Sequence, residues 1–485
     1  MKKLGELVSF SLPNSLKRLT ITDICDNSQK VIAGSVFVAL KGASVDGKAY
    51  VDDAILKGAR CVVLDGENFA YGVEIRNDIP FVFVRNARAE LAHMLGKFFD
   101  GNFDGLAAVT GTNGKSSTVD MVRQIWTGAG ITGASIGTLG VISEKNNENL
   151  SANLTSPGAI ELRKILNKLQ ERKIKNIVLE ASSHGLDQSR IDGLKFDVCA
   201  FTNFSRDHLD YHQTLENYWR AKERLFSEIA LQKTVIVVNS DDKYSARICE
   251  IAKNRRMKCI SYGYEANDIR IVEIKQEETH QKVKALFWGK EISFVFPISG
   301  TFQVYNALCA AAICHFTGLK LDAIVDGLTK LHPINGRLEL ISQVGTASIY
   351  LDYAHTPDAL KNAILSLRNC AKNRIIVVFG CGGNRDASKR VLMGEIAREF
   401  ADIVIVTDDN PRNENPEQIR KMILKGCPVA KEIADRKNAI EYAIDMLSYG
   451  DALLVAGKGH ENYQQIGDEF TDFSDRDIIL SKVFP

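Results

Sequence analysis

A run of residues suited to phosphate binding lies at Thr110-Gly111-Thr112-Asn113-Gly114-Lys115-Ser116-Ser117. It follows an apolar, strand-like stretch and precedes a helical pattern. In such a unit, glycines let backbone N–H groups close around phosphate oxygens, and the helix N-terminus adds a favourable dipole. Lys115 would bring a positive charge to the outer phosphates, and Ser116 would hold Mg²⁺. Val109 occupies the leading glycine position of the full pattern, so the segment predicts nucleotide binding by a variant loop. A plain glycine turn before a helix would leave the Lys-Ser pair unexplained.

Polar side chains crowd the ends of two further predicted strands. Glu180 closes the strand 177–180 and is a candidate Mg²⁺ ligand, because the carboxyl ends of parallel strands face the ligand crevice. The alternative is a strand-end glutamate in a salt bridge. His208 lies in the polar stretch 202–212 and is a second candidate ligand, although an isolated histidine is more often structural. Lys222, in the helical stretch 218–226, would by itself be an exposed helical lysine.

The elements that must position these residues alternate between short β-branched runs and longer helical patterns. This alternation predicts βαβ units with parallel sheets, and therefore an α/β fold. The expected strands are 34–40, 61–64 and 81–84, then 106–110, 177–180, 198–202 and 234–239, and finally 348–352, 375–379, 403–407 and 453–456. The pattern at 272–296 indicates a small antiparallel insertion.

Composition and charge exclude several classes of protein. The 485 residues are 45% apolar and 25% charged, which is ordinary globular usage, and the length suggests about three domains. Lys and Arg number 61 against 60 Asp and Glu, so the net charge of +1 gives no broad case for binding nucleic acid or a membrane. We expect neither a membrane span nor a secretory signal. The ten cysteines contain no C-x-x-C pair, which favours reduced thiols in the cytoplasm.

Taken together, the ordered motifs resemble the Mur ligase family, the ATP-dependent amide-bond synthetases of peptidoglycan precursor assembly. The resemblance runs from Asp26-Asn27-Ser28 to Gly457-Lys458-Gly459-His460-Glu461, nearly the whole chain. It implies three domains: a UDP-substrate-binding domain at 1–100, a central ATP-binding domain at 101–332, and a Rossmann-like C-terminal domain at 333–485 that binds the incoming amino acid. Within the family, the chain resembles the members that add the third amino acid to UDP-N-acetylmuramoyl-L-alanyl-D-glutamate. A cytoplasmic monomer that uses ATP and Mg²⁺ is the corresponding expectation.

The resemblance assigns roles residue by residue. The muramoyl dipeptide and its UDP group are expected to contact Asn27, Ser28, Ala43, Ser44, Val45, Thr155, Ser156, Ser182, Gln188 and Arg190. ATP is expected to contact Thr110, Gly111, Thr112, Asn113, Gly114, Lys115, Ser116, Ser117, Asn306, Arg337, Asp352 and His355. The implied metal ligands are Ser116, Glu180, His208 and Lys222 as a carbamate, and the implied catalytic residues are Lys115, His208 and Lys222. A carbamate is anionic and can bridge to Mg²⁺, which a free ammonium cannot do.

Two positions depart from the family pattern. Ser156 replaces the second threonine of the family's Thr-Thr-Pro stretch but keeps a hydroxyl, and Gln303 stands where many members have asparagine.

The segment Asp409-Asn410-Pro411-Arg412 resembles the signature of members that add meso-diaminopimelate. This amino acid carries a distal carboxylate, which the guanidinium of Arg412 can bind with two parallel hydrogen bonds, and lysine has no such group. The resemblance implies that Arg385 assists, and that Gly457 and Glu461 hold the distal ammonium. The alternative is that the segment is only a turn that opens a helix.

The reaction implied is activation of the D-Glu γ-carboxylate by ATP to an acyl phosphate, followed by attack of the amine. Positioning and charge neutralisation would dominate such a phosphoryl transfer. Three alternatives stay open: the same ligase using L-lysine, another amide ligase of the superfamily such as folylpolyglutamate synthetase, and a phosphate-loop binding module without ligase chemistry.

Overall fold

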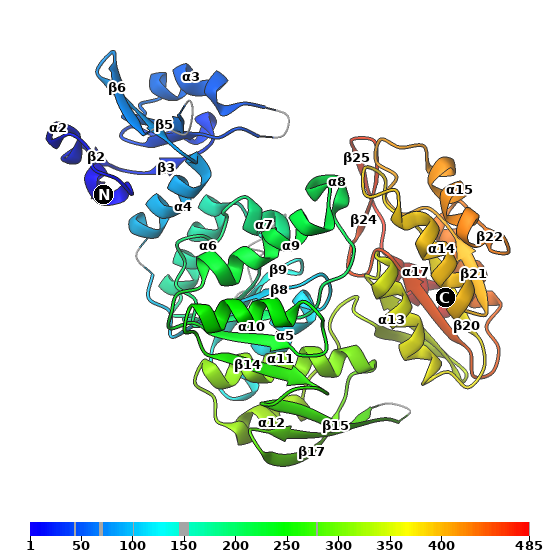
Figure 1. Cartoon of the computed structure of the whole chain (residues 1–485). Coiled ribbons are helices and arrows are strands. Elements are labelled where there is room, and N and C mark those ends of the chain that lie inside the picture. The colour runs from blue at the N-terminus through cyan, green and yellow to red at the C-terminus, as the bar shows by residue number, and fades with distance from the viewer. Residues whose placement is uncertain (43–44, 67–70, 100, 145–154, 278–279, 485) are drawn as a thin grey trace. The chain divides into compact units, whose positions relative to one another are not determined.

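The computed structural model describes residues 1–42, 45–66, 71–99, 101–144, 155–277 and 280–484 (Figure 1). The chain divides into two compact units. The first comprises Met1–Ala108, Thr132–Cys199 and Ala221–Thr234, and the second comprises Val109–Ile131, Ala200–Arg220 and Val235–Pro485. Across the described ranges, no helix combines the length and the apolar character needed to cross a membrane.

The N-terminal part of the first unit is built on a five-stranded sheet in the order β3-β4-β5-β7-β6. Its strands are β3 (Ile24–Cys25), β4 (Val36–Ala39), β5 (Cys61–Asp65), β6 (Gly72–Arg76) and β7 (Ile79–Val84), and only the β6–β7 pair is antiparallel. Alternate residues of β4 enter different cores. Val36 and Val38 pack with α4 (Ala87–Phe98), whereas Phe37 and Ala39 pack with α3 (Val51–Leu56). Burial on both faces explains why these strands read as continuous apolar runs.

Short elements precede this sheet, and further parallel pairing follows it within the first unit. The N-terminal elements are β1 (Lys2–Lys3), α1 (Leu4–Leu7), α2 (Asn14–Lys17) and β2 (Thr20–Ile21). Later come β9 (Gly133–Gly137), β10 (Gly140–Ser143), α6 (Ala159–Glu171), β11 (Asn176–Glu180) and α7 (Ser183–Asp187). Strand β9 pairs parallel with β11 and antiparallel with β10.

Three elements belong in part to each unit: β8 (Gly105–Thr110), β12 (Val198–Phe201) and α9 (Leu215–Arg224). A π-helical turn at Leu225–Ile229 follows α9. The second unit then contains α5 (Lys115–Gly128), α8 (Leu209–His212), β13 (Val235–Asn239), α10 (Ser245–Asn254), β14 (Cys259–Gly263), β15 (Ile269–Gln276), β16 (Gln281–Phe287), β17 (Lys290–Phe296), α11 (Thr301–Phe316) and α12 (Leu321–Thr329).

The predicted antiparallel insertion is confirmed. Strands β15, β16 and β17 are antiparallel neighbours, and β15 continues the parallel pairing of β13 and β14. Helix α11 is apolar around most of its circumference, because it contacts α5 and α12 as well as the strands β13 and β14.

The C-terminal part of the second unit has a six-stranded sheet in the order β18-β19-β23-β20-β21-β22, drawn in yellow to red in Figure 1. Its elements are β18 (Glu339–Val344), β19 (Ala347–Asp352), α13 (Pro357–Arg368), β20 (Ile375–Phe379), α14 (Lys389–Phe400), β21 (Ile403–Val406), α15 (Pro416–Gly426), β22 (Lys431–Glu432), α16 (Arg436–Asp445), β23 (Ala452–Ala456), β24 (Tyr463–Ile466), β25 (Glu469–Asp472) and α17 (Asp475–Val483). Only β18 pairs antiparallel within the sheet, and β24 and β25 form a separate hairpin.

Both faces of this sheet are covered by helices. On β20, Ile375, Val377 and Phe379 share a core with α13, α14 and α15. Ile376 and Val378 pack on the opposite face, with α16 and α17. The carboxyl ends of β19, β21 and β23 therefore present Asp352, Asp409 and Gly457 from a rigid, doubly covered sheet.

Candidate functional site

The phosphate loop joins β8 to α5, as its sequence predicts. Gly114 has a φ of 84°, and a side chain there would collide with Asn306. Lys115 starts α5, and its ammonium donates to the carbonyl oxygens of Gly111 at 2.9 Å and Thr112 at 2.8 Å. The lysine is thus held over its own loop, at the N-terminus of a 14-residue helix. This is the arrangement that binds a polyphosphate.

A second group of side chains supports this loop from within the same unit. Arg337 donates to Ser116 Oγ at 3.0 Å. Asn306 Nδ2 donates to Gln303 Oε1 at 2.9 Å, and Gln303 Nε2 donates to the carbonyl oxygen of Arg337 at 3.3 Å. Gln303 is completely buried, so this departure from the family pattern has a structural role: it orients Asn306.

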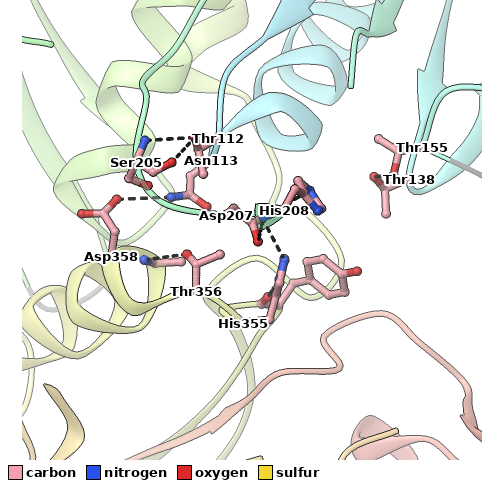
Figure 2. A network of polar contacts seen from close by, with 12 residues as sticks. Thr112, Asn113, Thr138, Thr155, Ser205, Asp207, His208, His355, Thr356 and Asp358 are labelled. Atoms are coloured by element: carbon pink, nitrogen blue, oxygen red, sulfur yellow. Dashed lines mark hydrogen bonds and ion pairs between the residues drawn. The ribbon is translucent and has the colours of Figure 1, made fainter. Parts of the chain in front are cut away.

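The loop after β12 closes against the phosphate loop (Figure 2). Thr112 N–H donates to the carbonyl oxygen of Asn203 at 2.8 Å, and Asn113 N–H donates to Asn203 Oδ1 at 2.9 Å. Asn113 Nδ2 also donates to Asp358, in the first turn of α13, at 3.2 Å. Asn113 therefore contacts both segments that flank the loop.

Asp207 lies between two imidazoles that the sequence singled out (Figure 2). Its Oδ2 is 3.3 Å from His208 Nε2 and 3.8 Å from His355 Nε2. Burial alone would raise the pKa of Asp207, but His208, His355 and Lys389 together hold that pKa well below its usual range. His208 has a φ of 53°, which is uncommon for a residue with a side chain. The sequence reasoning missed Asp207, and its place beside His208 in the polar strand end was the available signal.

In the first unit, Glu180 is the centre of a hydrogen-bonded cluster. Its carboxylate, 2% exposed, accepts the Thr138 N–H at 2.8 Å and the Thr138 hydroxyl at 3.3 Å. Thr138 Oγ1 also donates to Thr155 Oγ1 at 3.1 Å (Figure 2). Ser156 Oγ donates to the Glu180 carbonyl oxygen at 2.8 Å.

The same cluster gathers the other residues predicted to contact the dipeptide. Ser182 N–H donates to Ser156 Oγ at 3.0 Å, and Arg190 Nη1 donates to the Ser156 carbonyl oxygen at 2.6 Å. Gln188 Oε1 accepts from Arg190 Nη2 at 2.8 Å. The hydroxyl that Ser156 keeps is thus used in two backbone contacts.

Lys222 corrects an expectation from the sequence. Considered alone, it was predicted to be an exposed helical lysine, but its side chain is 1% exposed on α9. A long cationic side chain is rarely buried this deeply without a specific role. Ser116 and His208 belong to the second unit, whereas Glu180 and Lys222 belong to the first.

The residues predicted to contact uridine lie near the N-terminal sheet. Asn27 caps the short helical turn Ser28–Lys30 by accepting the Gln29 N–H at 2.8 Å. Ser28 is buried, and Val45 is half exposed. Ala43 and Ser44 lie outside the described residues.

At the C-terminal sheet, Asp352 ends β19 and accepts the N–H groups of Leu338 and Ala354. Burial raises the pKa of Asp352 to about 6, and Arg337 opposes that shift. His355 Nδ1 lies 2.8 Å from the carbonyl oxygen of Tyr353.

The structure also brings together the segments expected to bind the third amino acid. Asn410 Nδ2 donates to Glu461 Oε2 at 2.9 Å. Arg412 Nη1 donates to the Gly383 carbonyl oxygen at 2.9 Å, and Arg412 has a φ of 51°. A side chain at Gly457 would lie 2.6 Å from Asp409 Oδ2.

The segment 409–412 is more than a turn that opens a helix. The next helix begins only at Pro416 and is capped by Asn415, which accepts the N–H groups of Glu417 and Gln418. Asp409 to Arg412 instead pair with the hairpin β24–β25: Arg412 N–H donates to the Gln465 carbonyl oxygen at 3.1 Å.

Comparison with known proteins identifies the family. Three family models match in order: "Mur ligase family, catalytic domain" at residues 20–101, "Mur ligase middle domain" at 109–314, and "Mur ligase, glutamate ligase domain" at 336–459. The chain belongs to the Mur ligase family. Its α/β fold is the Mur ligase architecture of an N-terminal, a central ATPase and a C-terminal domain.

Individual Mur ligases resemble the chain over nearly its full length. A protein of Mesorhizobium japonicum, named UDP-N-acetylmuramoyl-L-alanyl-D-glutamate–2,6-diaminopimelate ligase, is 42% identical over 95% of this chain and 94% of its own. A protein of the same name from Bradyrhizobium diazoefficiens is 41% identical over 99% and 98%. A solved structure of a ligase with that name has a TM-score of 0.72 at 29% identity, and covers 100% of this chain and 99% of its own.

Among the described residues of this Mur ligase, no three or more His, Cys, Asp or Glu side chains form a group that could hold a metal ion. The predicted Mg²⁺ set contains only two such residues, Glu180 and His208. Its other members are the Ser116 hydroxyl and Lys222, whose carbamate is itself a prediction, so that set stays a prediction.

Proposed function

We propose that this Mur ligase joins meso-diaminopimelate to the D-Glu γ-carboxylate of UDP-N-acetylmuramoyl-L-alanyl-D-glutamate, with consumption of ATP. The observation that carries the substrate assignment is the hydrogen-bonded group at 409–412 and Glu461, on a chain 42% identical to a diaminopimelate ligase. Mur ligases are ATP-dependent enzymes that form amide bonds, and the relatives named above act in building the cell-wall peptide. We place the reaction in the cytoplasm, and we expect the chain to act as a monomer.

ATP would occupy the phosphate loop, with its outer phosphates near Lys115. An oxygen of the γ-carboxylate would attack the γ-phosphorus, and ADP would leave. The acyl phosphate would then be attacked by the amine of the third amino acid, with loss of phosphate. Lys115 is already held over the loop by two carbonyl oxygens, so it needs little reorganisation to meet the developing charge.

Each unit offers oxygen ligands of the kind that Mg²⁺ binds. Glu180 offers a buried carboxylate that Thr138 holds in one orientation, and Ser116 offers a hydroxyl at a helix N-terminus. The proposed ligands are Ser116, Glu180, His208 and Lys222 as a carbamate. Bound there, the ion would neutralise phosphate charge.

Discrimination at the third position would rest on charge. Arg412 and Arg385 are proposed to bind the distal carboxylate of meso-diaminopimelate, and Glu461 its ammonium. At its distal end L-lysine carries an ammonium but no carboxylate, so it should not form the contacts with the two guanidinium groups.

The test is ATP-dependent release of phosphate in the presence of UDP-N-acetylmuramoyl-L-alanyl-D-glutamate, with meso-diaminopimelate or L-lysine at equal concentration. Strong stimulation by meso-diaminopimelate alone is expected. Stimulation by lysine would retain the ligase and overturn the role of Arg412. No stimulation by either, with intact ATP binding, would overturn the proposed reaction.

A further inference from the structure

Lys458 is a buried lysine next to the proposed amino-acid site. Its side chain is 0% exposed, and it follows Gly457 at the end of β23. Burying an ammonium away from water costs free energy unless the group is paired with an opposite charge and hydrogen-bonded. Here the Nζ atom donates to Asn410 Oδ1 at 2.9 Å and lies 3.7 Å from Glu461 Oε2. It also lies 5.6 Å from the ring centroid of Tyr463 and 5.8 Å from that of Phe473.

These contacts determine which way the Asn410 amide faces. Its oxygen accepts from Lys458 and from the Gln465 N–H at 2.9 Å. Two donors on the oxygen leave the NH₂ group to face Glu461, to which it donates at 2.9 Å. The order of contacts is therefore Lys458 to Asn410 to Glu461.

The same contacts keep Glu461 suited to a cation. Burial raises the pKa of Glu461, and Asp409 raises it further. Lys458, the Asn410 hydrogen bond and His355 oppose that rise. A neutral Glu461 would bind a substrate ammonium poorly, and these three groups favour the anionic form.

We propose that Lys458 is a positioning residue for the incoming amino acid: its ammonium orients the Asn410 amide, which holds the Glu461 carboxylate ready for the substrate ammonium. This inference rests on the proposed function, and no contact of Lys458 with the substrate is required. It adds to the site a residue that acts through Asn410 and Glu461.

The experiment compares wild type with Lys458→Met in phosphate release, and each substrate is titrated separately. We expect the KM for the amino acid to rise about 10- to 100-fold at neutral pH, because a buried charged contact is lost. The kcat and the KM for ATP should change less than about threefold. Lys437→Met, which removes an exposed lysine on α16, is the matched control and should leave all constants unchanged.

Two further measurements separate positioning from simple loss of structure. As pH rises from about 6 to 8.5, the amino-acid KM should fall more steeply in Lys458→Met than in wild type, because Glu461 has lost one of the groups that oppose the rise of its pKa. The Lys458→Met/Asn410→Ala double variant should lose less than the sum of the two single losses, since both changes remove the contact between Lys458 and Asn410.

If Lys458→Met does not fold, Lys458→Gln keeps a neutral donor to Asn410 and should show a smaller rise of the same KM. An unchanged amino-acid KM, equal losses for all three substrates, or additive effects in the double variant would overturn the inference alone. A wild type that neither meso-diaminopimelate nor lysine stimulates would overturn the proposed function and the inference with it.

Discussion

Arg436, the first residue of α16, and Asp475, the first residue of α17, form an ion pair in which both side chains are 0% exposed. Arg436 Nε and Nη2 donate to the two carboxylate oxygens at 2.8 and 2.7 Å. Nη2 also donates to the Ala456 carbonyl oxygen at 2.9 Å, and Nη1 to that of Asp408 at 3.4 Å. The guanidinium thereby joins the ends of β21 and β23, next to Asp409 and Gly457.

We expect Arg436→Met to destabilise this part of the chain severely, because it leaves the Asp475 carboxylate buried without its cation. Breaking a buried pair by removing one partner costs about 3–5 kcal/mol. A domain of this size loses about 2–4 °C in Tm per kcal/mol, so the corresponding transition should move down by roughly 6–20 °C. The amino-acid KM should also rise, because the strand ends that carry the site lose the guanidinium that is hydrogen-bonded to both of them.

Scanning calorimetry of the full chain measures this change. Arg76→Met is the control, because it breaks an exposed ion pair with Glu74 whose side chains are 55% and 56% exposed. It should cost less than about 1 kcal/mol. The Arg436→Met/Asp475→Leu double variant removes both charges and should recover most of the loss. A decrease in Tm no larger than that of Arg76→Met, or a double variant worse than the single one, would refute the reasoning.

Three further predictions address the site. Arg412→Lys should raise the KM for meso-diaminopimelate about 10- to 100-fold, because an ammonium cannot reproduce the paired hydrogen bonds; steady-state phosphate release measures it, and an unchanged KM would contradict the assignment. The pKa of Asp352 is raised from 3.8 to about 6 in the folded chain, so its contribution to stability is complete below pH 3.8 and is lost as pH rises through about 6. That loss is of the order of 3 kcal/mol. Urea unfolding compared at about pH 4 and pH 7 should show the loss in wild type but not in Asp352→Asn. An equal pH dependence of stability in both proteins would argue against this prediction. Lys222→Ala should nearly abolish phosphate release, and bicarbonate should not restore it, whereas near-normal turnover would remove the carbamate role.

Much of the secondary structure follows from local patterns in the chain. The strands β5, β8, β13 and β20 lie within a residue of their predicted positions, because buried strands have largely apolar sequences. Strands β6, β9, β10 and β18 were not predicted. Strand β6 is largely exposed, and the short strands β9 and β10 contain glycines, so neither a continuous apolar run nor a clear alternation marks them in the sequence.

Features that can be read from the sequence and features that depend on tertiary packing differ in how far apart along the chain their residues lie. The phosphate loop was readable from its residues because glycine spacing, the lysine and the strand–helix context act within about ten positions of one another. The burial of Lys222 was not readable, since a helical pattern indicates periodicity but not what packs against each face.

The same limit applies to the contacts between distant segments. Asn410 and Glu461 are 51 positions apart, and Lys458 reaches Asn410 across 48. Asp207 and His355 come from different sheets of the second unit, and nothing near either residue in the chain specifies the other. Which of the many polar side chains meet depends on strand order and on the covering of both sheet faces, and these are properties of the packed chain, because desolvation and pairing act only once distant segments share one interior.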